Sequence, residues 1–218
     1  MRVWGVGTSR TIRVHWALCE LGVPYETREI IPRTESMQDP EFRAVSQRGK
    51  VPIFEDGDLV MGESCAILFY LADRYREHAV LAPEPGTAER ARFDDLCLFT
   101  LSELDGPLYI VRRHEGLADI YGAAPTAVAS ARSYFQQQAH HIERVLERNG
   151  PYLSGSDFSA ADLMLASCLV WAKLIGIELP EILSEHLARS SQRAGYREAV
   201  ARNFPPAAME MLRSTGSG

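Results

Sequence analysis

The spacing of apolar residues changes once along the chain, and this change is the strongest constraint on its fold. Up to residue 78, short strand-like runs alternate with helical stripes, whereas from residue 88 onward every apolar stripe has helical spacing. The Pro-rich stretch AVLAPEPGT, residues 79–87, separates the two patterns. The sequence therefore predicts an α/β domain over 1–78, a linker over 79–87 and an all-helical domain over 88–218.

The first domain is expected to have the element order β-α-β, a loop, then β-β-α. MRVWGV and YETREII have strand character, and VPIFE and LVM read as a hairpin with its turn at Asp56 and Gly57. Helices are expected over 11–21, ending at Gly22, and from Glu63 to about Arg76. A right-handed crossover around the first helix would make the first two strands parallel, with the hairpin adding antiparallel strands.

The second domain should consist of helices of unequal length. They are expected over 90–116, with a bend near Gly106 and Pro107, and over 126–148, about 159–175, 180–192 and 195–202. The third is the most apolar and should lie at the centre of the domain. It starts with a capping-box pattern, Ser159 to Asp162. The tail from residue 213 is expected to be disordered.

Composition excludes several classes of function. The net charge of −6 and the lack of a basic stripe argue against nucleic-acid binding. No apolar run approaches the roughly 20 residues of a membrane span, and the N-terminus lacks a signal-peptide core, so a cytoplasmic protein without membrane association is expected. The four cysteines form no CxxC pair and are read as reduced core residues. No metal site is predicted.

Two separated motifs give a more specific indication. GKVPIFEDG at 49–57 is followed by GESCAILFYLADRY at 62–75, and FSAADL at 158–163 opens the central helix of the second domain. With these motifs and domain lengths, the whole chain resembles a cytosolic glutathione transferase. The resemblance implies a thioredoxin-like first domain, an all-helical second domain and glutathione as the co-substrate. It also implies a homodimer, as is usual in the family.

The resemblance assigns roles to residues of the first motif. Val51, before a cis Pro52, would pair its backbone with the peptide of glutathione; without the family context, a trans bond at a strand start would be expected. Ser64, at a helix N-terminus, would hold the γ-glutamyl carboxylate, and Glu63 would accept from the ligand's amine. The alternative is that Glu63 and Ser64 merely cap the helix.

Two neighbouring residues are weaker candidates for glutathione binding. Lys50 would lie beside the glycyl carboxylate, and its alternative is a solvated loop lysine. Gln47 also falls in the binding segment, but Ser46-Gln47-Arg48 stands where the family often has Asn-Pro, which leaves the contacts of Gln47 open.

The catalytic group is expected in GVGTSRTIR, at the end of the first strand. The family uses Tyr, Ser or Cys there to stabilise the glutathione thiolate, and this segment has neither Tyr nor Cys. Ser9 aligns with the catalytic hydroxyl of serine-type, theta-like members. Thr8 and Arg10 remain alternates, and Ser9 could instead be the N-cap of the first helix.

The expected activity is attack of the glutathione thiolate on a hydrophobic electrophile, or reduction of an organic hydroperoxide. Tyr109, Arg112 and Arg113 are candidates to face the second substrate, although both arginines could equally form a solvated face. The alternative function is a non-catalytic glutathione-binding or protein-interaction module, because fold alone does not fix function.

Overall fold

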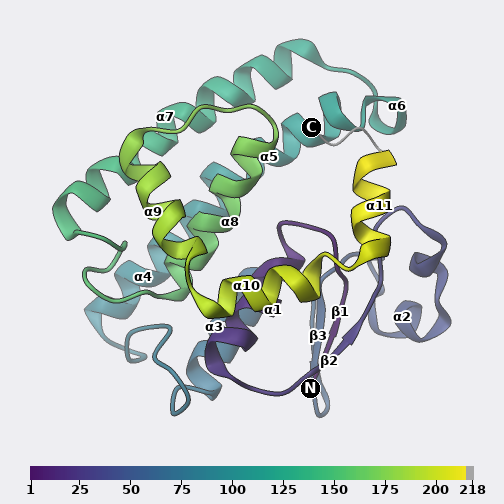
Figure 1. Ribbon diagram of the computed structural model, residues 1–218, viewed down its shortest axis with the longest axis horizontal. Helices are drawn as coiled ribbons and strands as arrows, with labels where there is room; N and C mark the ends of the chain where they lie inside the picture. Colours follow the sequence, from purple (N-terminus) through teal and green to yellow (C-terminus); the bar gives the residue numbers. More distant parts are fainter. Residues whose placement is uncertain (215–218) are drawn as a thin grey trace. The chain divides into compact units, whose positions relative to one another are not determined.

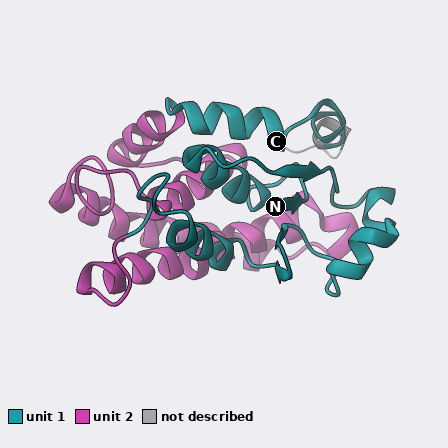
Figure 2. Cartoon of the chain, turned by 90° about the horizontal axis from the view of Figure 1, so that it is seen from below, with its two compact units in different colours: residues 1–82, 192–212 teal, residues 83–191, 213–218 magenta. Residues whose placement is uncertain are grey.

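The computed structural model describes residues 1–214, which form two compact units (Figures 1 and 2). The first unit contains Met1–Ala82 together with Gln192–Leu212, and the second contains Pro83–Ser191. The chain thus returns to the first unit near its end, whereas the sequence pattern placed everything from residue 88 onward in the second domain. Helical periodicity alone does not say which unit a helix packs on.

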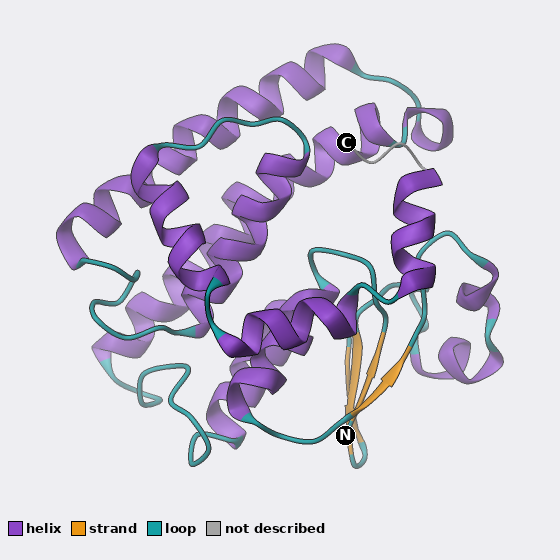
Figure 3. Ribbon diagram, in the orientation of Figure 1, coloured by secondary structure: helices purple, strands orange, loops and turns teal. Residues whose placement is uncertain are grey.

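The first unit is built on a four-stranded mixed sheet (Figure 3). Its strands are β1 (Arg2–Trp4), β2 (Glu26–Arg28), β3 (Ile53–Asp56) and β4 (Leu59–Met61), in the order β2-β1-β3-β4. β1 runs parallel to β2 and antiparallel to β3, and β3 runs antiparallel to β4. This thioredoxin-like arrangement confirms the predicted pairing, although each strand is shorter than its apolar run.

The first unit contains five α-helices among residues 1–214, two of which pack on α1. The five are α1 (Thr11–Leu21), α2 (Pro40–Val45) after the 3-10 turn η1 (Glu35–Gln38), α3 (Ser64–Arg74), α10 (Ala194–Asn203) and α11 (Pro206–Ser214). α1 has the predicted bounds and ends at Gly22, which adopts a left-handed conformation with φ 63°. α3 and α10 both pack on α1, so most of its residues are buried.

Side-chain contacts explain why α10 joins the first unit. The Arg193 guanidinium donates to both carboxylate oxygens of Glu20, at 2.9 and 2.7 Å. The rings of Trp16 and Tyr196 lie 4.7 Å apart. α11 begins after Pro205 and takes up the start of the segment expected to be disordered; residues 215–218 of that segment lie outside the described residues.

The second unit is helical throughout. It contains α4 (Ala88–Phe99), η2 (Thr100–Asp105), α5 (Gly106–Val111), η3 (Arg112–Gly116), α6 (Ala118–Tyr121), α7 (Pro125–Asn149), α8 (Ala160–Leu174) and α9 (Glu181–Ser191). Near Gly106, where the sequence predicted a bend, the π-helical segment η2 ends at Asp105 and α5 begins with Gly106 and Pro107. Because Pro107 has no N–H to donate to the preceding turn, regular α-helical bonding is interrupted there. No helix among residues 1–214 is long and apolar enough to cross a membrane.

α8 is the most buried helix of this unit, as its composition predicted. The capping box at its start is present, and the Asp162 carboxylate is the centre of a buried network. Asp162 accepts hydrogen bonds from the backbone N–H groups of Leu153 and Ser159, at 2.8 and 2.9 Å. It also accepts from the Ser159 hydroxyl at 2.7 Å and lies 3.0 Å from Nε2 of buried His186 on α9.

We expect Asp162→Ala to lower the free energy of unfolding by about 3–5 kcal/mol, because it strands several buried donors at once. Asp157→Ala is the matched control, since Asp157 is exposed and, among residues 1–214, accepts a hydrogen bond only from the neighbouring Ser156 hydroxyl. Urea denaturation of the three proteins would measure the difference. Equal stabilities for the two variants would contradict the structural role of Asp162.

Candidate functional site

The loop between β1 and α1 is shaped by close packing against Val51. Gly5 has φ 117°, and a Cβ atom built on it would lie 2.5 Å from the Val51 Cβ. Any larger residue at position 5 would therefore push Val51 away and also strain the backbone. This contact places the segment before β3 directly beside the loop that carries Thr8 and Ser9.

The Thr8 hydroxyl caps the start of α1. Thr8 Oγ1 accepts hydrogen bonds from the N–H groups of Arg10 and Thr11, at 3.3 and 3.0 Å. In return, the Thr8 N–H donates to Thr11 Oγ1 at 3.0 Å, and the Thr11 hydroxyl donates to the Thr8 carbonyl at 3.0 Å. The two hydroxyl oxygens are 2.9 Å apart, and since the Thr11 proton is already used, Thr8 is the donor between them. The Thr8 hydroxyl is thus fully engaged.

Ser9 differs from its neighbour in this respect. Its side chain is half-buried, and its hydroxyl makes no hydrogen bond to any residue of the described part of the chain. Thr8, not Ser9, therefore caps the first helix, which removes the alternative reading of Ser9 as the N-cap. The Ser9 hydroxyl remains available to an external acceptor.

Val51 presents a backbone edge just before β3. The Val51–Pro52 peptide bond is cis, as the resemblance to the family implied. The sheet pairing of β3 starts at Ile53, and within residues 1–214 neither the N–H nor the C=O of Val51 makes a hydrogen bond. These two groups can pair with an extended peptide, in the manner of an added strand.

Glu63 and Ser64 lie at the start of α3, and each side chain bonds to an arginine and does not cap the helix. Glu63 has extended backbone and makes no capping bond; its carboxylate instead pairs with the Arg48 guanidinium at 2.8 Å. Ser64 is buried, and its Oγ accepts from Nη1 of the fully buried Arg13 at 3.4 Å. The helix N-terminus, with Arg13 and Arg48 beside it, provides the positive potential that a carboxylate requires.

The segment before Val51 is held by its backbone. Ser46 Oγ accepts from the Lys50 N–H at 3.0 Å and donates to the Lys50 carbonyl at 2.9 Å. The side chains of Gln47 and Lys50 are exposed, and among residues 1–214 neither makes a hydrogen bond or an ion pair. Sequence reasoning missed the roles of Arg13, Arg48 and Ser46. Of these three residues, only Arg48 has a signal in the sequence, because it directly precedes the Gly49-Lys50 step of the first motif.

His15 supports the same loop from within α1. It is buried, and Nε2 lies 3.1 Å from the Gly5 carbonyl while Nδ1 lies 2.9 Å from the Tyr25 hydroxyl. Because a carbonyl can only accept, Nε2 carries the proton and Nδ1 accepts from Tyr25. Burial lowers the pKa of His15 to about 4, so the imidazole is neutral near pH 7.

The candidates for the second substrate belong to the second unit. Tyr109, on α5, and Arg112 are half-buried, and Arg112 Nη1 lies 3.4 Å from the Gly116 carbonyl oxygen. The guanidinium of Arg113 lies 4.2 Å from the centre of the Tyr121 ring, which accounts for its position by a cation–π contact.

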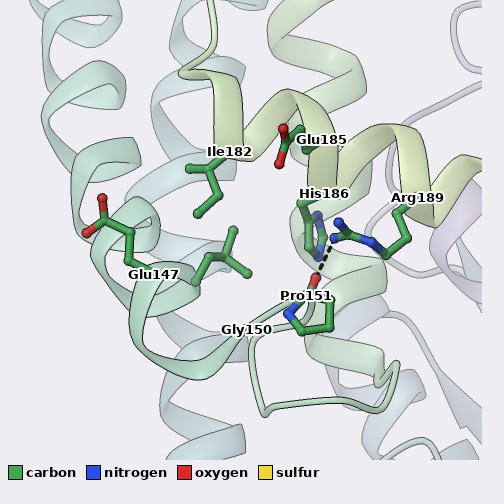
Figure 4. A pocket seen from close by; sticks show the side chains of 8 residues that line it. Glu147, Gly150, Pro151, Ile182, Glu185, His186 and Arg189 are labelled. Carbon is green, nitrogen blue, oxygen red and sulfur yellow. Dashed lines mark hydrogen bonds between the residues drawn. The ribbon is translucent and has the colours of Figure 1, made fainter.

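A pocket of the second unit lies between the end of α7 and α9 (Figure 4). Its lining comprises Leu146, Glu147, Gly150, Pro151, Ile182, Glu185, His186 and Arg189. Arg189 Nη1 donates to the Pro151 carbonyl at 2.9 Å across one side of it. No residue predicted for the site lies in this pocket. Among residues 1–214, no cluster of three or more His, Cys, Asp or Glu side chains could hold a metal ion.

The chain matches two protein-family models and several known proteins along most of its length. Residues 6–79 match the family model "Glutathione S-transferase, N-terminal domain", and residues 111–201 match "Glutathione S-transferase, C-terminal domain". The chain is 30% identical over 191 residues to a glutathione S-transferase-like protein of Aspergillus terreus, covering 80% of each protein. It is 28% identical over 162 residues to human glutathione S-transferase theta-2, covering 73% of this chain and 66% of that protein.

A solved structure shows the same fold at lower identity. The glutathione transferase homologue of Lodderomyces elongisporus, crystallised with two glutathione molecules per subunit, superposes with a TM-score of 0.83 at 19% identity, covering 94% of this chain and 98% of that one. The two family models and the 30% identical relative show that the chain belongs to the glutathione S-transferase family.

The contrast between Thr8 and Ser9 predicts unequal effects of their substitution on the free energy of unfolding. Thr8→Ala removes the cap of α1 and should lower the free energy of unfolding by about 1–2 kcal/mol. Ser9→Ala removes no intramolecular bond and should change it by less than about 0.5 kcal/mol. Urea denaturation of both variants tests this. A larger loss for Ser9→Ala than for Thr8→Ala would contradict the assignment of the cap.

We predict that the free energy of unfolding falls in mild acid, because His15 is buried in its neutral form. Its pKa is about 6.5 in the unfolded chain and lower when folded, so the unfolded state binds more protons between pH 6.5 and 4. The contribution of His15 is complete above pH 6.5 and falls by about 2 kcal/mol from pH 7 to pH 5.

His15→Gln should therefore lose less stability than wild type over this pH step, as measured by urea denaturation at both pH values. His140→Gln is the control, because His140 is exposed on α7. Identical pH dependence in all three proteins would show that His15 does not titrate in this way.

Proposed function

We propose that this protein is a serine-type glutathione transferase in which Ser9 stabilises the thiolate of bound glutathione. The observation that carries the proposal is the difference between two adjacent hydroxyls. Thr8 is fully engaged in capping α1, whereas Ser9 makes no hydrogen bond within the described residues. Ser9 is half-buried, has no hydrogen-bond partner among residues 1–214, and belongs to the loop that packs against Val51 through Gly5; its hydroxyl suits an acceptor supplied by a ligand.

Glutathione binding rests on the groups around this loop. The free backbone groups of Val51, before cis Pro52, would pair with the cysteinyl residue of the tripeptide. Ser64 at the start of α3 would hold the γ-glutamyl carboxylate, and Glu63 would accept from its amine. Lys50 and Gln47, both exposed, would meet the glycyl end. The glutathione in the solved homologue from Lodderomyces supports this choice of ligand.

Thiol activation requires that the anion be stabilised more than the neutral thiol. A free cysteine thiol titrates at about 8.5, and lowering that value by two units takes roughly 2.7 kcal/mol. The first amides of α1 contribute little directly, because Thr8 already accepts from Arg10, Thr11 and Ile12. The Ser9 hydroxyl and the dipole of α1 are therefore the main stabilising groups, and Thr8 becomes the weaker alternate.

The reaction then follows from the thiolate. Its proton passes to solvent, and its sulfur attacks an electrophilic carbon, so that a C–S bond forms as the bond to the leaving group breaks. With an organic hydroperoxide, sulfur attacks oxygen, and a second glutathione completes the reduction to alcohol, water and glutathione disulfide. We assign the second substrate, a hydrophobic electrophile, to the region of Tyr109, Arg112 and Arg113.

The oligomeric state and the cellular location are proposed from membership of the family. We propose a homodimer in the cytoplasm, where glutathione is kept reduced. All four cysteines are free thiols in the structure, which is consistent with a reducing compartment.

A non-catalytic glutathione-binding module is the alternative. It would keep the contacts of Val51, Glu63 and Ser64 without activating the thiol. The free Ser9 hydroxyl favours the enzyme, because a binding module gains nothing from an unpaired donor at that place.

The test is the ultraviolet absorbance of the glutathione thiolate against pH, with glutathione bound to wild type, Ser9→Ala and Ser102→Ala. Ser102→Ala is the control, because Ser102 is an exposed serine of the second unit. We expect the thiol to titrate with a midpoint near pH 6.5 in wild type and in Ser102→Ala, and at about 8.5 in Ser9→Ala. Conjugation of an activated aryl halide at pH 6.5 should fall in parallel. Binding without any depression of the midpoint in wild type would leave only the binding module.

A further inference from the structure

The loop that carries Ser9 is held by a residue near the other end of the chain. The Gly7 N–H donates to the backbone carbonyl of Asn203 at 2.6 Å. The side-chain amide of Asn203 donates in turn to the Thr8 carbonyl at 3.2 Å. These two bonds hold the two residues directly before Ser9, and Asn203 is completely buried.

Asn203 is suited to this contact by its place in α10. It is the last residue of that helix, so its backbone carbonyl has no partner within the helix and is free to accept from Gly7. Gly7 has φ 80°, a conformation that favours glycine and turns its N–H towards α10. The interaction thus joins a helix C-terminus to a turn of the loop that is formed by a glycine with positive φ.

The Thr8 carbonyl is where this contact meets the cap of α1. It accepts from the Ile12 N–H at 3.1 Å and from the Thr11 hydroxyl at 3.0 Å, as well as from Asn203. The orientation of the Thr8–Ser9 peptide is therefore fixed from two sides, by α1 and by α10. That peptide determines where the Ser9 side chain points.

The surrounding packing makes this end of α10 a firm support. α10 is attached to α1 by the Arg193–Glu20 ion pair. Beyond Asn203, Ala208 of α11 is buried against Val6 and Ile31, and a Cβ atom on Gly7 would lie 3.2 Å from Ala208. The returning segment therefore packs on the loop, and from residue 203 to residue 208 its only polar side chain is that of Asn203.

We propose that Asn203 is a positioning residue for catalysis: it fixes the Gly7–Thr8 backbone so that the Ser9 hydroxyl meets the glutathione sulfur. Asn203 acts through Ser9 and touches neither glutathione nor the second substrate. This inference rests on the proposed function.

Two variants of the full-length protein test it. Asn203→Ala removes the side-chain donor, and Asn203→Asp keeps the shape but sets a carboxylate against the Thr8 carbonyl. Asn149→Ala is the matched control, because the Asn149 amide also donates to a backbone carbonyl, that of Leu153, at 2.6 Å in the second unit. Asn203→Asp keeps the test possible if Asn203→Ala does not fold.

The first readout separates positioning from binding. We expect the thiol midpoint of bound glutathione to rise by about one pH unit in either Asn203 variant, which lowers the thiolate fraction at pH 6.5 about fivefold. Affinity for S-methylglutathione, which has no thiol to ionise, should change less than about twofold. An unchanged midpoint in a folded Asn203 variant, or an equal rise in Asn149→Ala, would overturn the proposal.

The second readout is a double-mutant cycle with Ser9→Ala. If Asn203 acts through Ser9, Asn203→Ala should raise the thiol midpoint in wild type but not in the Ser9→Ala background. An equal rise in both backgrounds would show that Asn203 acts by another route. If Ser9→Ala alone leaves the midpoint unchanged, the proposed function fails; if only the Asn203 variants leave it unchanged, this inference alone fails.

Discussion

Helix α1 is buried on almost every side, and the polar groups that it carries inward must find partners there. Burial of an unpaired polar or charged group costs several kcal/mol. The elements that pack on α1 must therefore provide hydrogen-bond partners for its polar side chains. Arg13 reaches Ser64 at the start of α3, and His15 reaches the Gly5 carbonyl in the loop after β1. Glu20 accepts from Trp16 and Arg193, which attaches α10. The packing of one helix thereby brings together the loop, the N-terminus of α3 and the end of the chain.

The proposed site consists of groups that have no partner within the described residues, the Ser9 hydroxyl and the backbone N–H and C=O of Val51. Thr8 satisfies the first amides of α1, so the helix offers a dipole at its N-terminus but few unpaired N–H groups. In the proposed mechanism Ser9 would supply the donor that Thr8 cannot, and the Asn203 amide bonds to the Thr8 carbonyl between them. Stability and activity would then be divided between neighbouring hydroxyls: Thr8 is engaged within the protein, and Ser9 would bind the ligand.

Local patterns predicted much of this fold. The bounds of α1, the strand pairing and the capping box at Ser159 all follow from short-range spacing and turn residues, and the structure has them. The return of residues 192–212 to the first unit could not be predicted, because the partners of Arg193 and Asn203 are far away in sequence. Nor could the sequence tell which of Thr8 and Ser9 caps α1, since either hydroxyl can cap a helix. The geometry of the loop shows that Thr8 does.

The most direct test of this account is a crystal structure of the protein with glutathione bound. We expect the sulfur to lie within hydrogen-bonding distance of Ser9 Oγ, with Thr8 Oγ1 still bonded to the Arg10 and Thr11 amides and the cysteinyl backbone paired with Val51. A sulfur bound instead by the Thr8 hydroxyl or the Arg10 guanidinium, with Ser9 pointing away, would contradict the division of roles on which the account depends.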